Sequence, residues 1–172
     1  MLVLIATALA QAAAFTPPAL PARWGLEPSA VAARPLLPTP AQADLPRGMY
    51  GYTAALATGR VALGVAPIVA PARSAALLGF PEAHDNATSR LMARLFGVRD
   101  IGLGALTMAS AHDTTTLRRA YLFNAAIDIA DTSMIAIPLI ADDGIDEAAW
   151  RSVGFALGGC SLWLIGAWWT TR

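Results

Sequence analysis

The sequence is poor in charge and contains no lysine. Only 14% of its 172 residues are charged, whereas 56% are hydrophobic; soluble domains are about one quarter charged. Twelve arginines supply all the positive charge, and twelve acidic residues balance them, so the net charge is zero. Because no net field attracts a polyanion, we expect no nucleic-acid partner. The composition favours a small membrane protein.

Residues that commonly carry chemistry are also scarce. The single cysteine, Cys160, excludes a disulfide framework and a cysteine-rich metal site. The two histidines, His84 and His112, fall in separate loops on opposite sides of the predicted membrane, so they cannot share a metal. The serines have no histidine at a plausible depth in the membrane, so a nucleophile with a neighbouring base is missing. We therefore expect no catalysis, no metal and no cofactor.

The first 47 residues differ from the rest of the chain. Residues 1–15 are apolar and form either a signal peptide or a short membrane helix, since fifteen helical residues reach only about 22 Å. Residues 16–47 hold eight of the twelve prolines, which predicts an extended arm. Residues 48–172 form the predicted membrane domain.

Four apolar segments of helical length follow the arm. They cover about residues 48–69, 89–111, 117–141 and 152–171, and residues 72–80 fit a short interfacial helix. The last segment is uncharged and ends in Trp168 and Trp169, as expected of a membrane span with an aromatic belt. The sequence thus predicts an all-α protein, an antiparallel four-helix transmembrane bundle, with or without an extra N-terminal membrane segment.

Three of these segments carry charges near their middle. Because a charge in the hydrocarbon core costs about 2.5–3.5 kcal/mol, such residues normally face the bundle interior in pairs. The candidate charges are three arginines and three aspartates. If Arg94 reaches the membrane interface, one aspartate has no arginine partner in the interior, and Asp128 and Asp131 are the candidates. The set of intramembrane charges, structural or relay, is Arg60, Arg94, Arg99, Asp100, Asp128 and Asp131.

Small residues share helix faces with these charges. Glycines at steps of three and four let helix backbones approach each other closely. A Gly-x-x-x-Gly pair predicts a similar packing patch on the last segment. The predicted helix-packing glycines are Gly64, Gly97, Gly104, Gly154 and Gly158.

Arginine placement predicts the orientation. With four spans, six arginines fall on the side that holds the C-terminus and three on the other, beside the acidic residues 142–147. Because positively charged loops stay in the cytoplasm, we expect a bacterial inner membrane protein with a cytoplasmic C-terminus.

Two stretches resemble a known family. Residues 94–104 (RLFGVRDIGLG), followed by Asp128-x-x-Asp131, and residues 59–64 (GRVALG) are similar to short bacterial and fungal membrane proteins, a domain of unknown function with a Gly-x-Arg-Asp/Glu signature. The resemblance covers about residues 50–140. It implies a four-helix membrane bundle with the six charges in signature positions, and it implies no activity.

Three functions stay open on this basis. The first is a non-catalytic accessory or scaffold subunit that packs against other membrane proteins, or against itself, in the lipid bilayer. The second is proton- or ion-coupled transport or relay that uses Asp128 and Asp131 with Arg60 and Arg99. The third is binding of a small ligand, lipid or cofactor in the polar bundle interior.

Overall fold

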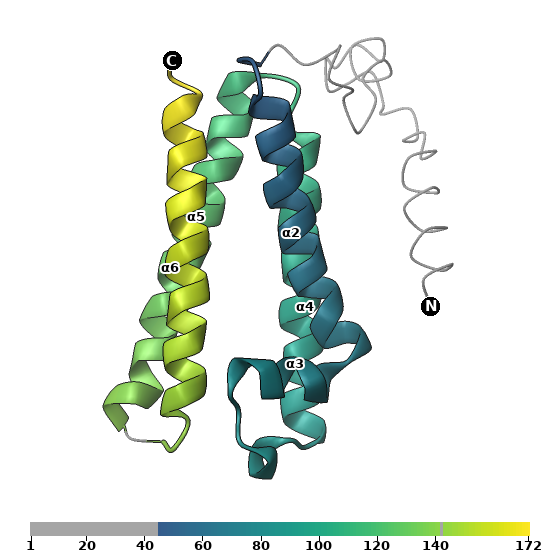
Figure 1. Ribbon diagram of the computed structural model, residues 1–172, viewed down its shortest axis with the longest axis vertical. Coiled ribbons are helices and arrows are strands. Elements are labelled where there is room, and N and C mark those ends of the chain that lie inside the picture. The colour runs from purple at the N-terminus through teal and green to yellow at the C-terminus, as the bar shows by residue number, and fades with distance from the viewer. Residues whose placement is uncertain (1–44, 142) are drawn as a thin grey trace, which may run out of the picture. The chain divides into compact units, whose positions relative to one another are not determined.

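The computed structural model describes residues 45–141 and 143–172 (Figure 1). The predictions for residues 1–15, and for residues 16–47 up to residue 44, lie outside this part. The described chain is all-helical and contains no strand, which confirms the predicted class. Its elements are α2 (Met49–Val69), α3 (Pro71–Leu78), the 3₁₀ turn η4 (Glu82–His84), α4 (Ala87–Ala109), α5 (Thr114–Ala141) and α6 (Asp146–Trp169).

Local chemistry explains where these helices begin and end. Gly48 and Gly79 have positive φ values of 83° and 87°, a left-handed conformation that glycine adopts more easily than other residues. Gly48 precedes α2, and Gly79 follows α3. Asn86 caps α4, because its side chain accepts hydrogen bonds from the backbone N–H groups of Thr88 and Ser89. Helix α6 begins six residues earlier than predicted, with two acidic residues in its first turn, where the helix dipole favours negative charge.

The long helices pack as two antiparallel pairs, α2 with α4 and α5 with α6 (Figure 1). In the first pair, Gly64 of α2 lies against Gly97 of α4. In the second pair, Tyr121 of α5 lies against Gly166 of α6. Small residues at these points allow the close approach.

Aromatic and polar contacts join the two pairs near the start of α2. The Tyr52 hydroxyl donates to the carbonyl of Leu162, at 2.6 Å, and so connects α2 to α6. The hydroxyls of Thr53 and Tyr121 lie 2.7 Å apart and connect α2 to α5. Tyr121 is fully buried and packs in the same core as Trp163. These contacts hold the two helix pairs in register with each other.

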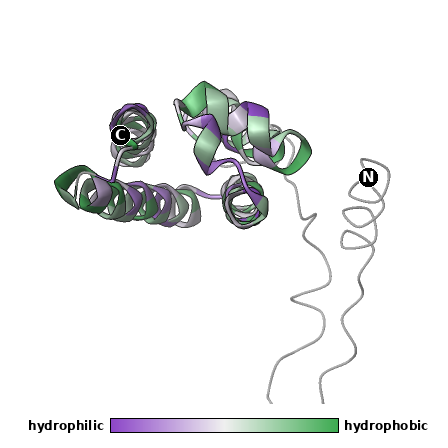
Figure 2. Ribbon diagram, turned by 90° about the horizontal axis from the view of Figure 1, so that it is seen from below, coloured by the Kyte–Doolittle hydropathy of each residue, from purple (hydrophilic) through white to green (hydrophobic). Residues whose placement is uncertain are grey.

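Three helices, α2, α5 and α6, are long and apolar enough to cross a membrane. With 21 residues, α2 reaches about 31 Å, close to the thickness of the hydrocarbon core. Figure 2 shows hydrophobic residues, in green, on the long helices. The sequence predicts four membrane spans, and three of the four long helices have the length and composition of a span. Helix α4 is too charged to qualify, because it holds Arg90, Arg94, Arg99 and Asp100.

Candidate functional site

Five of the six predicted charges meet in one cluster, which we call the ion network. Arg60 of α2 lies 2.9 Å from Asp128 of α5 and 3.4 Å from Asp100 of α4. Arg99 of α4 donates two hydrogen bonds to Asp131 of α5, at 2.8 and 2.9 Å. Asp100 also lies 3.4 Å from Arg99, so its carboxylate is shared between both arginines. The ion network therefore ties three helices together.

Helical spacing brings these residues inside. Thr53, Ala57, Arg60 and Gly64 recur at steps of four and three along α2, and all four are buried. Asn124 and Asp128 are buried on α5 in the same way, four residues apart. On α2 and α5, the helix faces that carry Arg60 and Asp128 thus turn inward.

Burial decreases across the ion network. The side chains of Arg60 and Asp128 are 8% and 7% exposed, whereas those of Arg99 and Asp131 are 34% and 29% exposed. Water and salt screen a buried ion pair less than an exposed one. The attraction between Arg60 and Asp128 is therefore stronger than the attraction between Arg99 and Asp131. The Arg99–Asp131 pair makes the better hydrogen bonds, because Nη1 donates to Oδ1 and Nη2 donates to Oδ2 in a bidentate arrangement.

The sixth predicted charge lies elsewhere. Arg94 is exposed on α4 and makes no ion pair with any described residue. Within the ion network, two arginines therefore face three carboxylates. If every group is ionised, the cluster carries one excess negative charge.

Helix α6 contributes shape and an aromatic ring to the site, not charge. A Cβ atom at Gly159 would lie 2.8 Å from Asp128 Oδ2, so this glycine makes room for the carboxylate. The Arg60 guanidinium carbon lies 5.7 Å from the ring centre of Trp163, within cation–π range. Sequence reasoning missed both residues. The available signal was their spacing, one helical turn apart in an uncharged span.

The predicted packing pair on α6 needs correction. A Cβ atom at Gly154 or at Gly158 would meet nothing within 4 Å, so both glycines face open space within the described chain. Gly159 and Gly166 are the glycines of α6 that contact α5. On α2 and α4, by contrast, Gly64, Gly97 and Gly104 each lie against the neighbouring helix.

A second polar contact lies beside the ion network. The Asn124 side-chain amide donates to Thr107 Oγ1, at 2.9 Å, and connects α5 to α4. Some buried polar atoms nearby have no hydrogen-bond partner among the described residues, and each such atom costs about 1–3 kcal/mol. They are Arg60 Nε, Arg99 Nε, Asn124 Oδ1 and Trp163 Nε1.

The loop between α4 and α5 holds one of the two predicted loop histidines beside a capping carboxylate. Asp113 Oδ1 accepts a hydrogen bond from the backbone N–H of Thr116, at 2.8 Å, and Oδ2 accepts from the hydroxyl of Thr116. His112 Nε2 lies 2.8 Å from Asp113 Oδ2. These contacts, the backbone bond from Thr116 above all, lower the pKa of Asp113 below its usual 3.8.

No cluster suited to a metal ion is found among the described residues. Two surface hollows are lined by residues outside the ion network. One, of about 310 Å³, is lined by Arg151, Gly154 and Phe155. The other, of about 220 Å³, lies where α5 begins and α6 ends. Binding of a small ligand, lipid or cofactor among the network residues stays a prediction.

These contacts define an all-helical protein with membrane-length apolar helices and a shared set of buried ion pairs. The chain belongs to the family described as "Domain of unknown function (DUF4267)", whose sequence model matches residues 57–170 and so includes the whole ion network. The predicted membership of an uncharacterised family is thereby confirmed, while the bacterial or fungal origin and the signature stay predictions. No curated protein and no solved structure matches the chain.

Proposed function

We propose that the chain spans the membrane four times as an antiparallel bundle, with α4 as the fourth span. The charges of α4 have a place in this arrangement. Arg99 and Asp100 contact other helices, and Arg90, near the N-terminal end of α4, pairs with Asp85 at 2.6 Å. Arg94 lies two turns from the same end, so its long side chain can reach the interface. Paired or end-placed charges are the ones that membrane helices tolerate.

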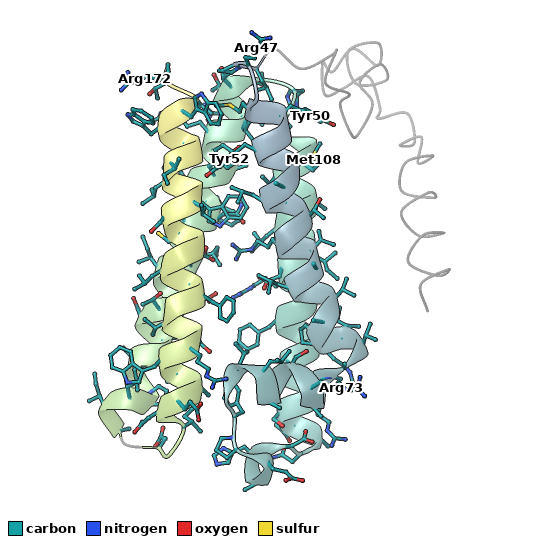
Figure 3. All side chains as sticks on the ribbon, in the orientation of Figure 1. Arg47, Tyr50, Tyr52, Arg73, Met108 and Arg172 are labelled. Carbon is teal, nitrogen blue, oxygen red and sulfur yellow. The ribbon has the colours of Figure 1, made fainter. Side chains whose placement is uncertain are left out.

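Charge at the two ends of the helices supports a cytoplasmic C-terminus in a bacterial inner membrane. Arg47 and Arg172 lie at one end and Arg73 lies toward the other (Figure 3). The first end also holds Arg118 and Arg119, and Asp113 is its only described acidic residue. The described acidic residues of the other end are Glu82, Asp85, Asp143, Asp146 and Glu147. The positive-inside rule favours the cytoplasm for the first end.

Within this membrane frame, the protein acts as a non-catalytic accessory or scaffold subunit. The observation that carries this proposal is that the ion network consists of direct contacts between helices. Such contacts fix a shape, and large apolar side chains are left on the outside. Leu95, Phe96 and Val98 of α4 are all more than half exposed. Lipid or other membrane proteins, including a second copy of the chain, are the partners that such a surface suits.

A charge exchange tests the structural role of the ion network. Arg99→Asp and Asp131→Arg should each destabilise the purified protein by about 2 kcal/mol, less than the 3–5 kcal/mol of a fully buried pair. The double exchange restores the opposite charges and should recover most of that loss, as measured by thermal unfolding in detergent. A double variant as unstable as the singles would reject the structural role.

The size of the native assembly tests the subunit role. Native gels or native mass spectrometry of gently solubilised membranes should show this chain in a particle larger than one chain. The purified protein, run alone under the same conditions, is the control. A native particle of the size of a single chain would contradict the proposal.

Proton or ion relay is the second candidate, and the excess carboxylate of the ion network favours it. The four buried polar atoms without a described partner add to the case, since they suit internal water molecules. If the relay operates, vesicles that contain the protein should show pH-driven flux above protein-free vesicles. Asp128→Asn and Asp131→Asn should abolish that flux. Flux equal to that of empty vesicles would reject the relay.

A further inference from the structure

The hollow where α5 begins and α6 ends is lined mainly by polar side chains. Its volume is about 220 Å³. Two adjacent arginines lie at its edge, and both are exposed and make no ion pair with any described residue. The lining residues are Thr114, Thr115, Arg118, Arg119, Leu122 and Thr170.

The positive charge of the hollow is not neutralised locally. The only described acidic side chain at this end, Asp113, already accepts two hydrogen bonds from Thr116 and lies against His112. Arg47 and Arg172 add further positive charge at the same end (Figure 3). Unpaired guanidinium groups in a hollow suit oxyanions such as phosphate, because their planar fork matches the oxygens of the anion.

One side of the hollow is apolar. Leu122 lines it and is 41% exposed, and the next residue, Phe123, is 50% exposed. Trp168, in the last turn of α6, is 57% exposed, as expected of an aromatic side chain at a membrane interface. The site therefore offers cations at the helix ends and apolar surface toward the helix middle. An amphiphile with a negatively charged head has the complementary order of groups.

We propose that this hollow binds a phosphate group, and that the phosphate belongs to the head of an anionic phospholipid. This inference rests on the proposed membrane insertion but not on the subunit role or the relay. Arg118 and Arg119 contact the phosphate oxygens, the threonine hydroxyls line the hollow beside them, and the acyl chains follow Leu122 and Phe123. Basic pockets on the cytoplasmic side of membrane helices recognise lipid heads in this manner.

Native mass spectrometry of the purified full-length protein tests the site. Phosphatidylglycerol, phosphatidylcholine or inorganic phosphate is added to the protein in a neutral detergent. Phosphatidylglycerol should bind about tenfold more tightly than phosphatidylcholine. The double variant Arg118→Gln/Arg119→Gln should bind phosphatidylglycerol about 30-fold more weakly, since each arginine near an anionic surface contributes about fivefold.

A matched variant controls for general electrostatics. The double variant Arg47→Gln/Arg172→Gln removes the same charge from the same end, but neither residue lines the hollow. The affinity of this variant for phosphatidylglycerol should therefore change by less than about twofold. Equal losses in the two double variants would overturn the site, as would equal binding of the two lipids. If the first double variant does not fold, the single variants should each lose about fivefold, and no loss in either would overturn the site.

The phosphate arm separates the two sources of the group. Phosphatidylglycerol that inorganic phosphate does not displace supports a lipid site. Displacement by inorganic phosphate alone would overturn the lipid assignment and leave a free-phosphate site. If the lipid site fails this test while native membranes still show a particle larger than one chain, the proposed subunit role stands, so the two proposals fail separately.

Discussion

The two helix pairs use glycine for opposite purposes. In the α2–α4 pair, Gly64 and Gly97 bring one backbone against the other, and a Cβ atom at either would overlap the carbonyl oxygen of its partner. In the α5–α6 pair, a Cβ atom at Gly166 would lie 2.7 Å from the Tyr121 ring, and Gly159 faces the Asp128 carboxylate. Between α2 and α4 the glycines allow two backbones to approach closely. Between α5 and α6 they leave space for the side chains of Tyr121 and Asp128.

This difference has an energetic consequence. A backbone atom moves only if its whole helix moves, whereas a side chain can change its torsion angles at lower cost. An added methyl group should therefore cost more between α2 and α4 than between α5 and α6. Variants of single glycines can test this comparison directly.

The largest effect is expected for Gly97→Ala. The new methyl group would meet the backbone of Gly64 and the side chain of Ile68, so the two helices must separate. We expect a loss of about 3 kcal/mol in the free energy of unfolding, at the upper end of overpacking costs. Thermal or denaturant unfolding in detergent measures it. Gly102→Ala on the same helix meets nothing within 4 Å and serves as the matched control.

Gly166→Ala should have an intermediate effect. The methyl group would press on the ring of Tyr121, which is fully buried and fixed by its hydrogen bond to Thr53. We expect a loss of about 1–2 kcal/mol, since the ring can tilt. Unfolding under the conditions used for Gly97→Ala gives the comparison. A larger loss for Gly166→Ala than for Gly97→Ala would contradict the distinction between the two interfaces.

Asp113→Ala removes a cap from the first turn of α5 and should cost about 1 kcal/mol near neutral pH. The folded protein lowers the pKa of this carboxyl, so its charged form stabilises the fold above the usual pKa of 3.8. That contribution is lost as the pH falls below 3.8 and through the lowered pKa of the folded state. The difference between wild type and variant should therefore shrink in acid.

Unfolding curves recorded at several pH values test this cap. Asp113→Asn is the matched control, because asparagine also accepts a hydrogen bond from a helix N-terminus but carries no charge. It should cost less than Asp113→Ala near neutral pH. A difference between wild type and Asp113→Ala that grows in acid would refute the assigned role of the carboxylate.

The smallest effects are expected for Gly154→Ala and Gly158→Ala. Both positions face open space, so the methyl group meets no described atom. Alanine favours a helix by about 1 kcal/mol over glycine, and the unfolding free energy of the single chain should stay the same or rise slightly. A loss comparable to that of Gly166→Ala would show that these glycines do pack within the chain.

The sequence predicted the helices and the inward faces of α2, α4 and α5. On these three helices a charge shares a face with small residues at steps of three and four, and the inward placement of Arg60, Gly97 and Asp128 follows from that pattern. Helix α6 gave no such guide. Its apolar residues surround the helix after Arg151, so a Gly-x-x-x-Gly pair could not reveal which face turns inward.

The choice of ion pairs was also beyond the sequence. Arg99 and Asp100 are neighbours about 100° apart on α4, so helical spacing alone does not identify the partner of either residue. In the structure, the Asp100 carboxylate lies 3.4 Å from the guanidinium group of Arg99 and also 3.4 Å from that of Arg60. The sequence correctly implied a surplus carboxyl if Arg94 lay apart, because that conclusion needs only a count of charges.

The amino-acid sequence by itself predicted four apolar helices after residue 47, with a few charges on inward faces, and three of the described helices are apolar enough to cross a membrane. Composition and helical periodicity suffice for these features because both are local properties of the chain. The tertiary structure decided that Gly159 faces Asp128, that Arg99 pairs with Asp131, and that Gly154 and Gly158 face outward. Those contacts depend on how far each helix is shifted and rotated against its neighbour, and close packing between helices sets that register.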